Sequence, residues 1–360
     1  MKYEYKQLGN GISVPCLHMD LTGSLDSLTR KELKKKIYGV IDQQGALLVQ
    51  DTGLKSIREY SEFLSSVGYR NHSYLGGSSP RTDQGGSVYT ATEIPADITI
   101  PIHQEMSYLN SMPDYISFFC EDPPQNDQKT NLIGDMRKFT DRLPVELKNR
   151  YKGKRSSLRR MLPPTGKNTG FYRAKKSWQE TLGTNNREKA LAIAGQKGWK
   201  LSWTDNDFLE IIQEPVPFFR THPIHGEIWC TQALSYQPMT RRLTAKKDGR
   251  TEDLQLLDSA LDNAPETIDQ MIMENGSSVP PKDSRIWFEI SLEIQTPYAL
   301  RQGDIIILDN ILMAHGRSQF TGPRRIFTAL GDRRSAGNGE LTADAGVSQA
   351  DKKGVQPATS

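Results

Sequence analysis

The order of apolar and polar positions predicts many short strands separated by loops and a few helices. The run GALLVQDTG, which begins at Gly45, is apolar and ends in turn residues, as buried strands do. Residues 54–68 place apolar side chains at helical spacing, and Gly68 suits the end of that helix. Residues 285–294 and 303–317 return to the apolar character of strands. This pattern favours a β-rich α+β fold.

Longer polar segments separate these elements. Residues 69–95 are rich in Gly, Ser, Thr and Arg and predict a long surface loop, a kind of segment that often carries function. Residues 143–200 are basic and prone to form helices, and residues 239–282 are polar and interrupted, which indicates an insertion or a lid. The segment 335–360 contains no aromatic residue and predicts a disordered tail. We therefore expect a single domain over residues 1–334.

The composition of the chain limits the kinds of molecule that it is expected to bind. The chain of 360 residues is 36% hydrophobic and 25% charged, which is typical of a soluble globular protein. A net charge of only +3 gives no reason to expect binding to nucleic acid or to a membrane. The chain lacks an apolar run of about 18 residues and a signal-peptide pattern at its start. Three widely spaced cysteines, Cys16, Cys120 and Cys230, suggest reduced thiols, so we expect a cytoplasmic protein.

Candidate chemistry appears in IPIHQEMSYLNSMPDYISFFC, the run that begins at Ile100. Residues two apart on a strand point to the same face, so His103 and Glu105 would share one space. His315 follows another apolar strand, 212 residues after His103. Two histidines and one carboxylate match the facial triad of non-haem Fe(II) oxygenases. The His-x-Glu pair alone is weak evidence, because a single strand histidine is more often a hydrogen-bonded core residue.

Two further residues indicate a dicarboxylate cosubstrate. Arg325 lies ten residues beyond His315, on what should be the next strand, and a guanidinium suits bidentate capture of a carboxylate. Thr130 could donate a hydroxyl hydrogen bond to the same group. 2-Oxoglutarate fits this arrangement, since its keto-acid end chelates iron while its far carboxylate meets the arginine.

The chain resembles the clavaminate synthase-like and taurine dioxygenase-like (TauD/TfdA-like) Fe(II)/2-oxoglutarate oxygenases, particularly the syringomycin-type amino-acid hydroxylases of nonribosomal peptide pathways. The matching blocks are VYTATEIPADITIPIHQEMSY, PDYISFFCEDPP, THPIHGEIW and GDIIILDNILMAHGRSQFTGPRRI, within residues 70–330. The resemblance implies a double-stranded β-helix, or jelly roll, with flanking helices. It also implies that His103, Glu105 and His315 bind Fe(II), and that Thr130 and Arg325 hold 2-oxoglutarate.

The chain departs from the relatives at two places. The relatives usually have a Gly-Gly-Glu-Thr turn before the threonine, whereas this chain has NDQKT, so the loop before Thr130 must close differently. Glu105 replaces the commoner aspartate, a variant found in the clavaminate synthase-like branch. Related halogenases carry a small residue there to admit chloride, so Glu105 argues against halogenation.

Several other residues could have either a functional or a purely structural role. Arg81, Tyr108 and Arg317 are candidate substrate contacts, but they could equally anchor a loop, pack in the core or cap a strand. His222 and His225 lie in a turn with Pro and Gly, which makes a second metal site a weak hypothesis. The basic run at residues 152–162 could dock an acidic carrier protein, although a solvated helix face is the more usual explanation.

The resemblance implies O₂-dependent oxidation of an amino acid or its derivative in secondary metabolite biosynthesis. Hydroxylation, desaturation and oxidative ring closure all remain open, as does a substrate that is free or attached to a carrier protein. Two alternatives use the same residues: a noncatalytic relative that only binds metal and 2-oxoglutarate, and a zinc hydrolase.

Overall fold

The computed structural model describes residues 3–9, 11–23, 26–72, 81–85, 88–125, 128–167, 176–263 and 267–333. The predicted tail at 335–360 lies outside these residues, as does part of the predicted loop at 69–95. In the described part, no helix is long and apolar enough to cross a membrane. Cys16, Cys120 and Cys230 are all buried free thiols.

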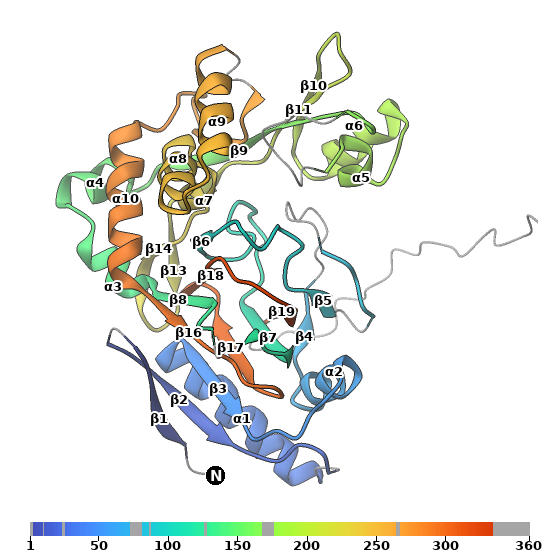
Figure 1. The fold of residues 1–360 in the computed structure, drawn as a ribbon, viewed down its shortest axis with the longest axis vertical. Coiled ribbons are helices and arrows are strands. Elements are labelled where there is room, and N and C mark those ends of the chain that lie inside the picture. Colours follow the sequence, from blue (N-terminus) through green and yellow to red (C-terminus); the bar gives the residue numbers. More distant parts are fainter. Residues whose placement is uncertain are drawn as a thin grey trace, which may run out of the picture.

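A large, mostly antiparallel sheet forms one half of the core (Figure 1). The predicted strand after Gly45 is confirmed as β3 (Ala46–Gln50). It pairs in parallel with β2 (Ile12–His18), and helix α1 (Ser27–Gln44) connects the two strands. The strand order is β1 (Glu4–Gly9), β2 (Ile12–His18), β3 (Ala46–Gln50), β17 (Ile305–Asp309), β7 (Tyr115–Asp122), β19 (Arg325–Asp332) and β4 (Arg70–Asn71), and β5 (Val88–Thr90) also pairs with β19.

A smaller sheet carries the two histidines. Its order is β16 (Gln295–Tyr298), β8 (Asn131–Asp135), β18 (Met313–Arg317) and β6 (Ile100–His103). Apolar side chains of both sheets belong to one buried cluster, with Ile102 and Ile133 from the small sheet and Ile116 and Ile306 from the large one. Burial of apolar surface between the sheets therefore fixes their relative position.

The helices α1 (Ser27–Gln44) and α2 (Ile57–Ser66) pack beside the large sheet, and α2 confirms the helix predicted at 54–68. The prediction for residues 285–294 is wrong, because they form part of helix α10 (Pro281–Ile294) and not a strand. Trp287, Ile290 and Ile294 recur at helical spacing and bury one face of α10. Pro281 at the first turn also suits a helix start, where no N–H partner is needed.

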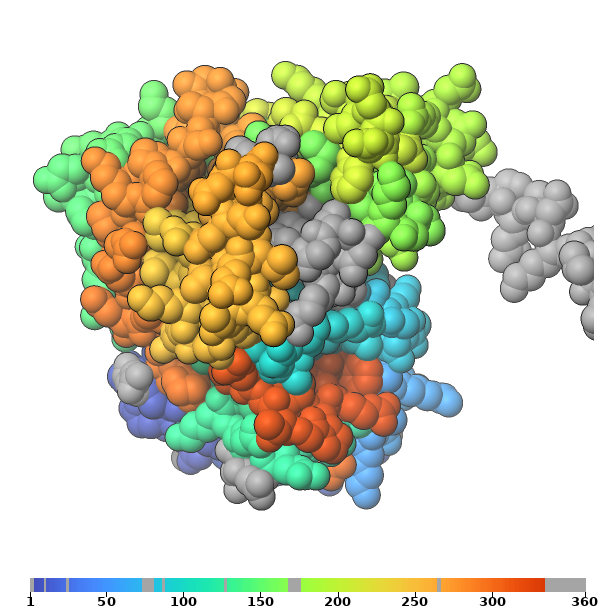
Figure 2. All heavy atoms as spheres, turned by 45° about the horizontal axis from the view of Figure 1, so that its top comes forward, coloured from blue at the N-terminus to red at the C-terminus, as the bar shows by residue number. Residues whose placement is uncertain are grey.

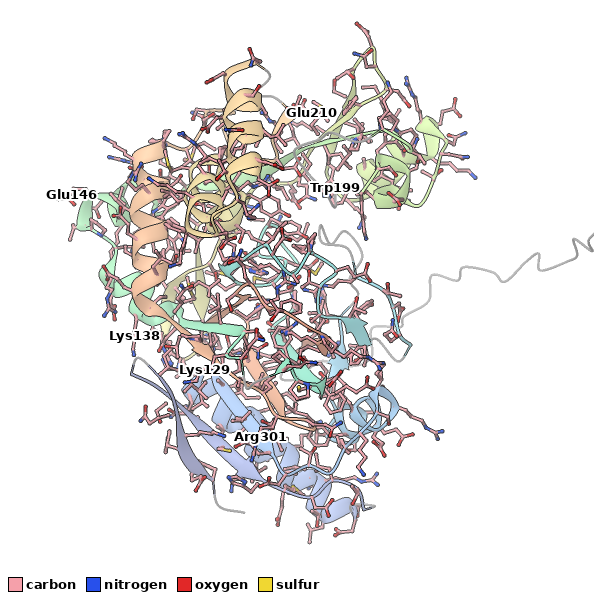
Figure 3. All side chains as sticks on the ribbon, in the orientation of Figure 1. Lys129, Lys138, Glu146, Trp199, Glu210 and Arg301 are labelled. Atoms are coloured by element: carbon pink, nitrogen blue, oxygen red, sulfur yellow. The ribbon has the colours of Figure 1, made fainter. Side chains whose placement is uncertain are left out.

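A third sheet lies beyond the small one, on a lobe that projects at one corner of the molecule (Figure 2). Trp199 and Glu210 mark this lobe in Figure 3, and Arg301 marks the opposite end of the molecule. The sheet joins β9 (Arg155–Leu162), β10 (Lys200–Trp203), β11 (Leu209–Ile212), β12 (Val216–Pro217) and β15 (Gln270–Met273), and the helices α5 (Trp178–Leu182) and α6 (Arg187–Gln196) complete the lobe.

The basic run at 152–162 is therefore mostly strand β9 and not a solvated helix face. Arg160 is buried, with its Nε 3.8 Å from Asp269 Oδ2, and Arg159 Nε lies 3.9 Å from Glu210 Oε1. Arg160 is thus turned inward, and both arginines lie near an acidic side chain of the same protein. The segment predicted as a lid at 239–282 contains α8 (Pro238–Lys247), α9 (Thr251–Asn263) and β15, which pairs with β9.

The remaining described elements connect these layers. They are α3 (Met136–Arg142), α4 (Val145–Tyr151), β13 (Phe219–His222), β14 (Gly226–Trp229) and α7 (Ala233–Tyr236). Among them α7 lies against β6, the strand that ends at His103.

Candidate metal centre

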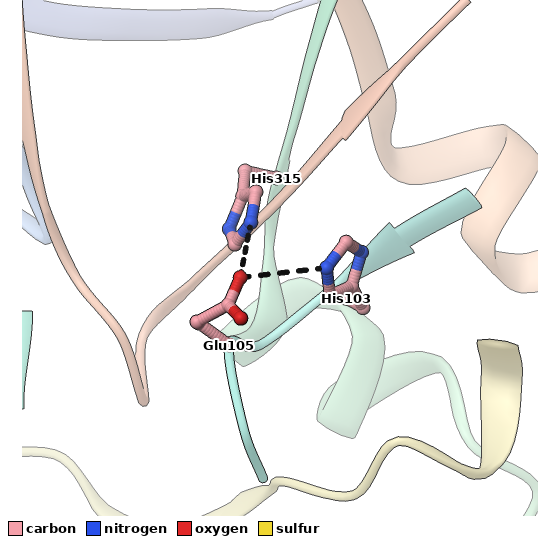
Figure 4. Close-up of side chains that lie close together, drawn as sticks. All are labelled: His103, Glu105 and His315. Carbon is pink, nitrogen blue, oxygen red and sulfur yellow. Dashed lines mark ion pairs between the residues drawn. The ribbon is translucent and has the colours of Figure 1, made fainter. Parts of the chain in front are cut away.

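Three side chains converge where β6 meets β18. The register of the small sheet places His315 directly opposite His103, and their ring centroids lie 4.5 Å apart. Glu105 Oε2 lies 3.3 Å from His315 Nε2 and 3.8 Å from His103 Nε2 (Figure 4). These three residues are the one group in the described chain whose ligand atoms could hold a metal ion, and the atoms all lie within 4.8 Å of one another.

Glu105 reaches this position differently from the sequence prediction. The strand ends at His103, and Glu105 begins a turn in which Met106 has a φ of 54°, the left-handed region that non-glycine residues rarely adopt. The side chains of His103 and Glu105 do lie close together, as predicted, but the predicted reason is wrong, because they do not lie on one strand. The carboxylate meets the histidines because the chain turns after the strand.

The carboxylate is held in its charged form. Burial alone would raise the pKa of Glu105, but the Arg81 guanidinium and the two imidazoles hold it well below its usual range. Arg81 Nη2 donates to Glu105 Oε2 at 2.7 Å, and both side chains are about 5% exposed or less. An ionised carboxylate is the form that binds a divalent cation.

The surroundings of the two histidines also suit metal binding. Burial, reinforced by the neighbouring His103, lowers the pKa of His315 to about 4, so its imidazole is neutral at neutral pH. His103 Nδ1 lies 2.9 Å from the Pro101 carbonyl oxygen, an arrangement in which Nδ1–H donates and Nε2 keeps its lone pair. Two histidines and one carboxylate are a donor set that suits Fe(II).

The close fit of β6 against β18 depends on Gly316, which follows His315. A Cβ at this position would lie 2.5 Å from the Ile100 carbonyl oxygen, a distance that real Cβ atoms do not reach. Gly316→Ala should push β6 away from β18 and lower the free energy of unfolding by about 1–3 kcal/mol, the usual effect of overpacking. Chemical denaturation measures this loss.

Gly39→Ala is the matched control for Gly316→Ala. Gly39 lies in α1, and a Cβ there would meet nothing within 4 Å. Removing a helix glycine should stabilise the protein by about 0.5–1 kcal/mol. Equal unfolding curves for wild type and Gly316→Ala would contradict the close approach of the two strands.

A pocket opens beside the histidines. Its lining includes His103, His315, Arg81, Arg317 and Arg324, together with apolar side chains such as Phe118. The Phe118 ring lies 5.0 Å from the His315 ring and forms an apolar wall. The pocket thus combines the candidate metal ligands with several guanidinium groups, which suits an anionic ligand that reaches the metal.

The positive end of this pocket is built around Arg324. Its Nε donates to Thr130 Oγ1 at 3.2 Å, and its Nη2 donates to Asn131 Oδ1 at 2.8 Å. Thr130 is buried behind Arg324 and is not itself among the residues that line the pocket. Burial lowers the pKa of Arg324 to about 10, which still leaves the guanidinium charged at neutral pH.

Arg325 does not reach the pocket, contrary to the sequence prediction. Its side chain is 62% exposed and pairs with Glu121 at 2.7 Å. β19 begins at Arg325, so Arg324 lies just before the strand, where its guanidinium contacts Thr130 and Asn131. The register of β19 against β7 also shifts between Arg325 and Ile326. The inward residue is Arg324.

The other sequence candidates take different places. Arg317 is buried and lines the pocket, but its guanidinium donates to the carbonyl oxygens of Ile94, Pro95 and Ile98, so it anchors that wall. Tyr108 is buried with its ring 6.0 Å from the Tyr236 ring. Tyr108 is not among the residues that line the pocket.

The turn that contains His222 and His225 serves the structure. His222 Nε2 lies 3.2 Å from Asp309 Oδ2, and its Nδ1 accepts from the backbone N–H of Ile224 and of His225. His225 Nε2 donates to the Gln43 carbonyl oxygen. Because these nitrogens are committed within the chain, the hypothesis of a metal pair loses its basis.

Sequence reasoning missed Asn131 and Asn310 at this site, and it assigned the carboxylate to Arg325 ahead of Arg324. Arg324 and Asn131 line the pocket, and Asn310 hydrogen-bonds to the backbone of Glu105. A positive neighbour of Arg325 was visible as the Arg-Arg pair, whereas nothing in the local pattern distinguishes Asn310 from an ordinary turn residue.

Comparison with known proteins identifies the family. The model for "Taurine catabolism dioxygenase TauD, TfdA family" matches residues 4–279, more than half of the chain. The chain belongs to this dioxygenase family. It is an Fe(II)- and 2-oxoglutarate-dependent oxygenase, which agrees with the geometry of the three candidate ligand side chains. The matched region includes His103 and Glu105 and ends before His315.

Individual relatives of this TauD/TfdA chain are distant but extend over most of its length. A clavaminate synthase-like protein of Arabidopsis thaliana is 23% identical over 89% of this chain and 90% of its own. The dapdiamide synthesis protein DdaC of Enterobacter agglomerans is also 23% identical, over 81% and 84%. The crystal structure of AAD-2 with Mn(II) and N-oxalylglycine aligns with a TM-score of 0.51 at 13% identity, covering 92% of this chain and 98% of that one.

Proposed function

We propose that this oxygenase oxidises an amino acid or an amino-acid derivative, with Fe(II) held by His103, Glu105 and His315. The two sheets would then form the jelly roll that the sequence resemblance implies. The observation that carries the proposal is the single pocket that joins both histidines to Arg324. A ligand with a chelating end and a distant carboxylate can bridge these two features.

Arg324 and Thr130 would hold the far carboxylate of 2-oxoglutarate. The Thr130 hydroxyl accepts a hydrogen bond from Arg324, so its own hydrogen remains available to a ligand oxygen. Asn131 accepts from the same guanidinium and keeps its plane fixed. A positioned, charged donor beside a neutral donor is well suited to a carboxylate.

Iron with 2-oxoglutarate supplies an oxidation of C–H bonds that is coupled to conversion of the cosubstrate to succinate. The side chains of this protein have other tasks, since the cofactor carries the difficult chemistry. Phe118 provides an apolar wall at His315 that limits access of water. Arg81 holds the Glu105 carboxylate in its ionised form and in one orientation.

The proposed substrate class rests on the relatives of this chain. DdaC is named for the synthesis of dapdiamide, which supports a place for this chain in the biosynthesis of an amino-acid derivative. Docking of a carrier protein loses its main support, because Arg160 is buried and Arg159 lies near Glu210. We therefore favour a free small molecule over a carrier-bound one.

The substrate class can be tested in two steps. Fe(II) and 2-oxoglutarate are first titrated into the metal-free protein without oxygen, and free amino acids and their derivatives are then screened for faster O₂ consumption. A free amino acid that accelerates O₂ consumption and is itself oxidised supports the proposal. Turnover only of carrier-loaded amino acids would overturn the choice of a free substrate.

Products should contain no halogen, even in high chloride or bromide. Glu105 occupies the position that a halide would need, and its pairing with Arg81 keeps it there. Mass spectrometry of reactions with added halide should show hydroxylated, desaturated or cyclised products only. A halogenated product would contradict the ligand role of Glu105.

A further inference from the structure

The three candidate ligands are not positioned by the same kind of contact. His103 and His315 face each other because β6 and β18 pair within one sheet. Glu105 lies outside this ladder, in the turn after β6, and the next residue has the positive φ noted above. Arg81 holds the carboxylate itself, so a separate contact must fix the backbone of Glu105 relative to the histidines.

Asn310 makes this contact. Its Oδ1 accepts from the Glu105 backbone N–H at 2.7 Å, and its Nδ2 donates to the Glu105 carbonyl oxygen at 2.9 Å. The carboxamide thus pairs with both polar backbone groups of Glu105, as a neighbouring strand would. Nδ2 also donates to the Pro113 carbonyl oxygen at 2.8 Å, and Asn310 is fully buried.

The position of Asn310 in the chain links the ligands directly. It lies in the turn between β17 and β18, five residues before His315. Asp309 Oδ1 accepts from the backbone N–H of Ile311 and of Leu312, which fixes the shape of this turn. One short segment therefore carries His315 and also holds the backbone of Glu105.

Gln104 secures the same turn from its other side. Its Nε2 donates to the carbonyl oxygens of Trp229 and Ile311 at 2.9 and 2.8 Å. The side chain of Gln104 and the backbone of Glu105 are thus both tied to the turn between β17 and β18. Such preorganisation lowers the entropic cost of metal binding, because less conformational freedom is lost when the metal binds.

We propose that Asn310 is a positioning residue that sets the metal affinity by fixing Glu105 relative to His315. The inference rests on the proposed ligand set. Partners that orient metal ligands typically change metal affinity by about 10–100-fold when they are lost. Asparagine is required because the site needs one acceptor and one amide nitrogen that donates twice.

Titration of Mn(II) into the metal-free protein provides a direct test. Electron paramagnetic resonance measures the concentration of free Mn(II) at each step. Asn310→Ala removes all three hydrogen bonds, and Asn310→Asp keeps the shape and the acceptor but loses both donors. Both variants should bind Mn(II) about 10–100-fold more weakly than wild type. If Asn310→Ala does not fold, Asn310→Asp decides the question.

A matched variant separates positioning from general destabilisation. Ser291 Oγ donates a buried hydrogen bond to the Phe288 carbonyl oxygen on α10, away from the metal centre. Ser291→Ala should lower the unfolding temperature and leave Mn(II) affinity unchanged. Asn310 variants with wild-type Mn(II) affinity would overturn this inference alone, whereas a wild-type protein that binds no Mn(II) would overturn the proposed ligand set.

Discussion

Replacing His315 by alanine is expected to abolish O₂-dependent formation of succinate from 2-oxoglutarate, and His103→Ala and Glu105→Ala should do the same. Each change removes one of three candidate ligands whose ligand atoms lie within 4.8 Å of one another, and no other group of this kind exists among the residues that the structure describes. The fold should survive, because both sheets contribute many other apolar residues to the core. Succinate is measured with added Fe(II), and circular dichroism checks folding.

His225→Ala is the matched histidine control. Its imidazole donates to the Gln43 carbonyl oxygen and does not approach the metal centre. Its succinate formation should equal that of wild type. Near-normal succinate formation by any variant of the three ligands would transfer the metal to another site.

The second large effect concerns two adjacent arginines. Arg324→Ala should weaken 2-oxoglutarate binding by roughly 2–5 kcal/mol, the usual cost of removing one partner of a buried charge pair. At about 1.4 kcal/mol per factor of ten, the dissociation constant should rise by about 30- to 4,000-fold. Equilibrium binding of 2-oxoglutarate in the presence of Mn(II) measures this change.

Arg325→Ala should leave the 2-oxoglutarate dissociation constant unchanged. Its side chain is 62% exposed and pairs with Glu121 instead of facing the pocket. The two variants differ by one position and remove the same charge, so the net charge of the protein cannot explain a difference between them. A large loss of affinity in Arg325→Ala with no loss in Arg324→Ala would reverse our assignment.

The sequence was a good guide to which residues meet and a poor guide to local geometry. The spacing of His103, Glu105 and His315 predicted a shared space, and the structure brings the three side chains together. The turn at Glu105 could not be predicted, because it depends on Asn310, more than 200 residues away. Long-range hydrogen bonds of this kind leave no local pattern.

The errors elsewhere have similar causes. The choice between Arg324 and Arg325 depends on where β19 begins and on the register shift after Arg325, and no single-strand pattern reveals either. The apolar run at 285–294 suits a strand by composition. Its buried residues recur at helical spacing, however, and the segment forms part of helix α10. The basic run at 152–162 became β9 because pairing with β11 and β15 outweighed its helix propensity.

A crystal structure with Mn(II) and N-oxalylglycine, an analogue of 2-oxoglutarate, tests the account most directly. We expect one metal ion bound by His103, Glu105 and His315, with the far carboxylate of the analogue against Arg324 and Thr130. A metal ion held by other residues, or a far carboxylate that binds Arg325, would contradict the account.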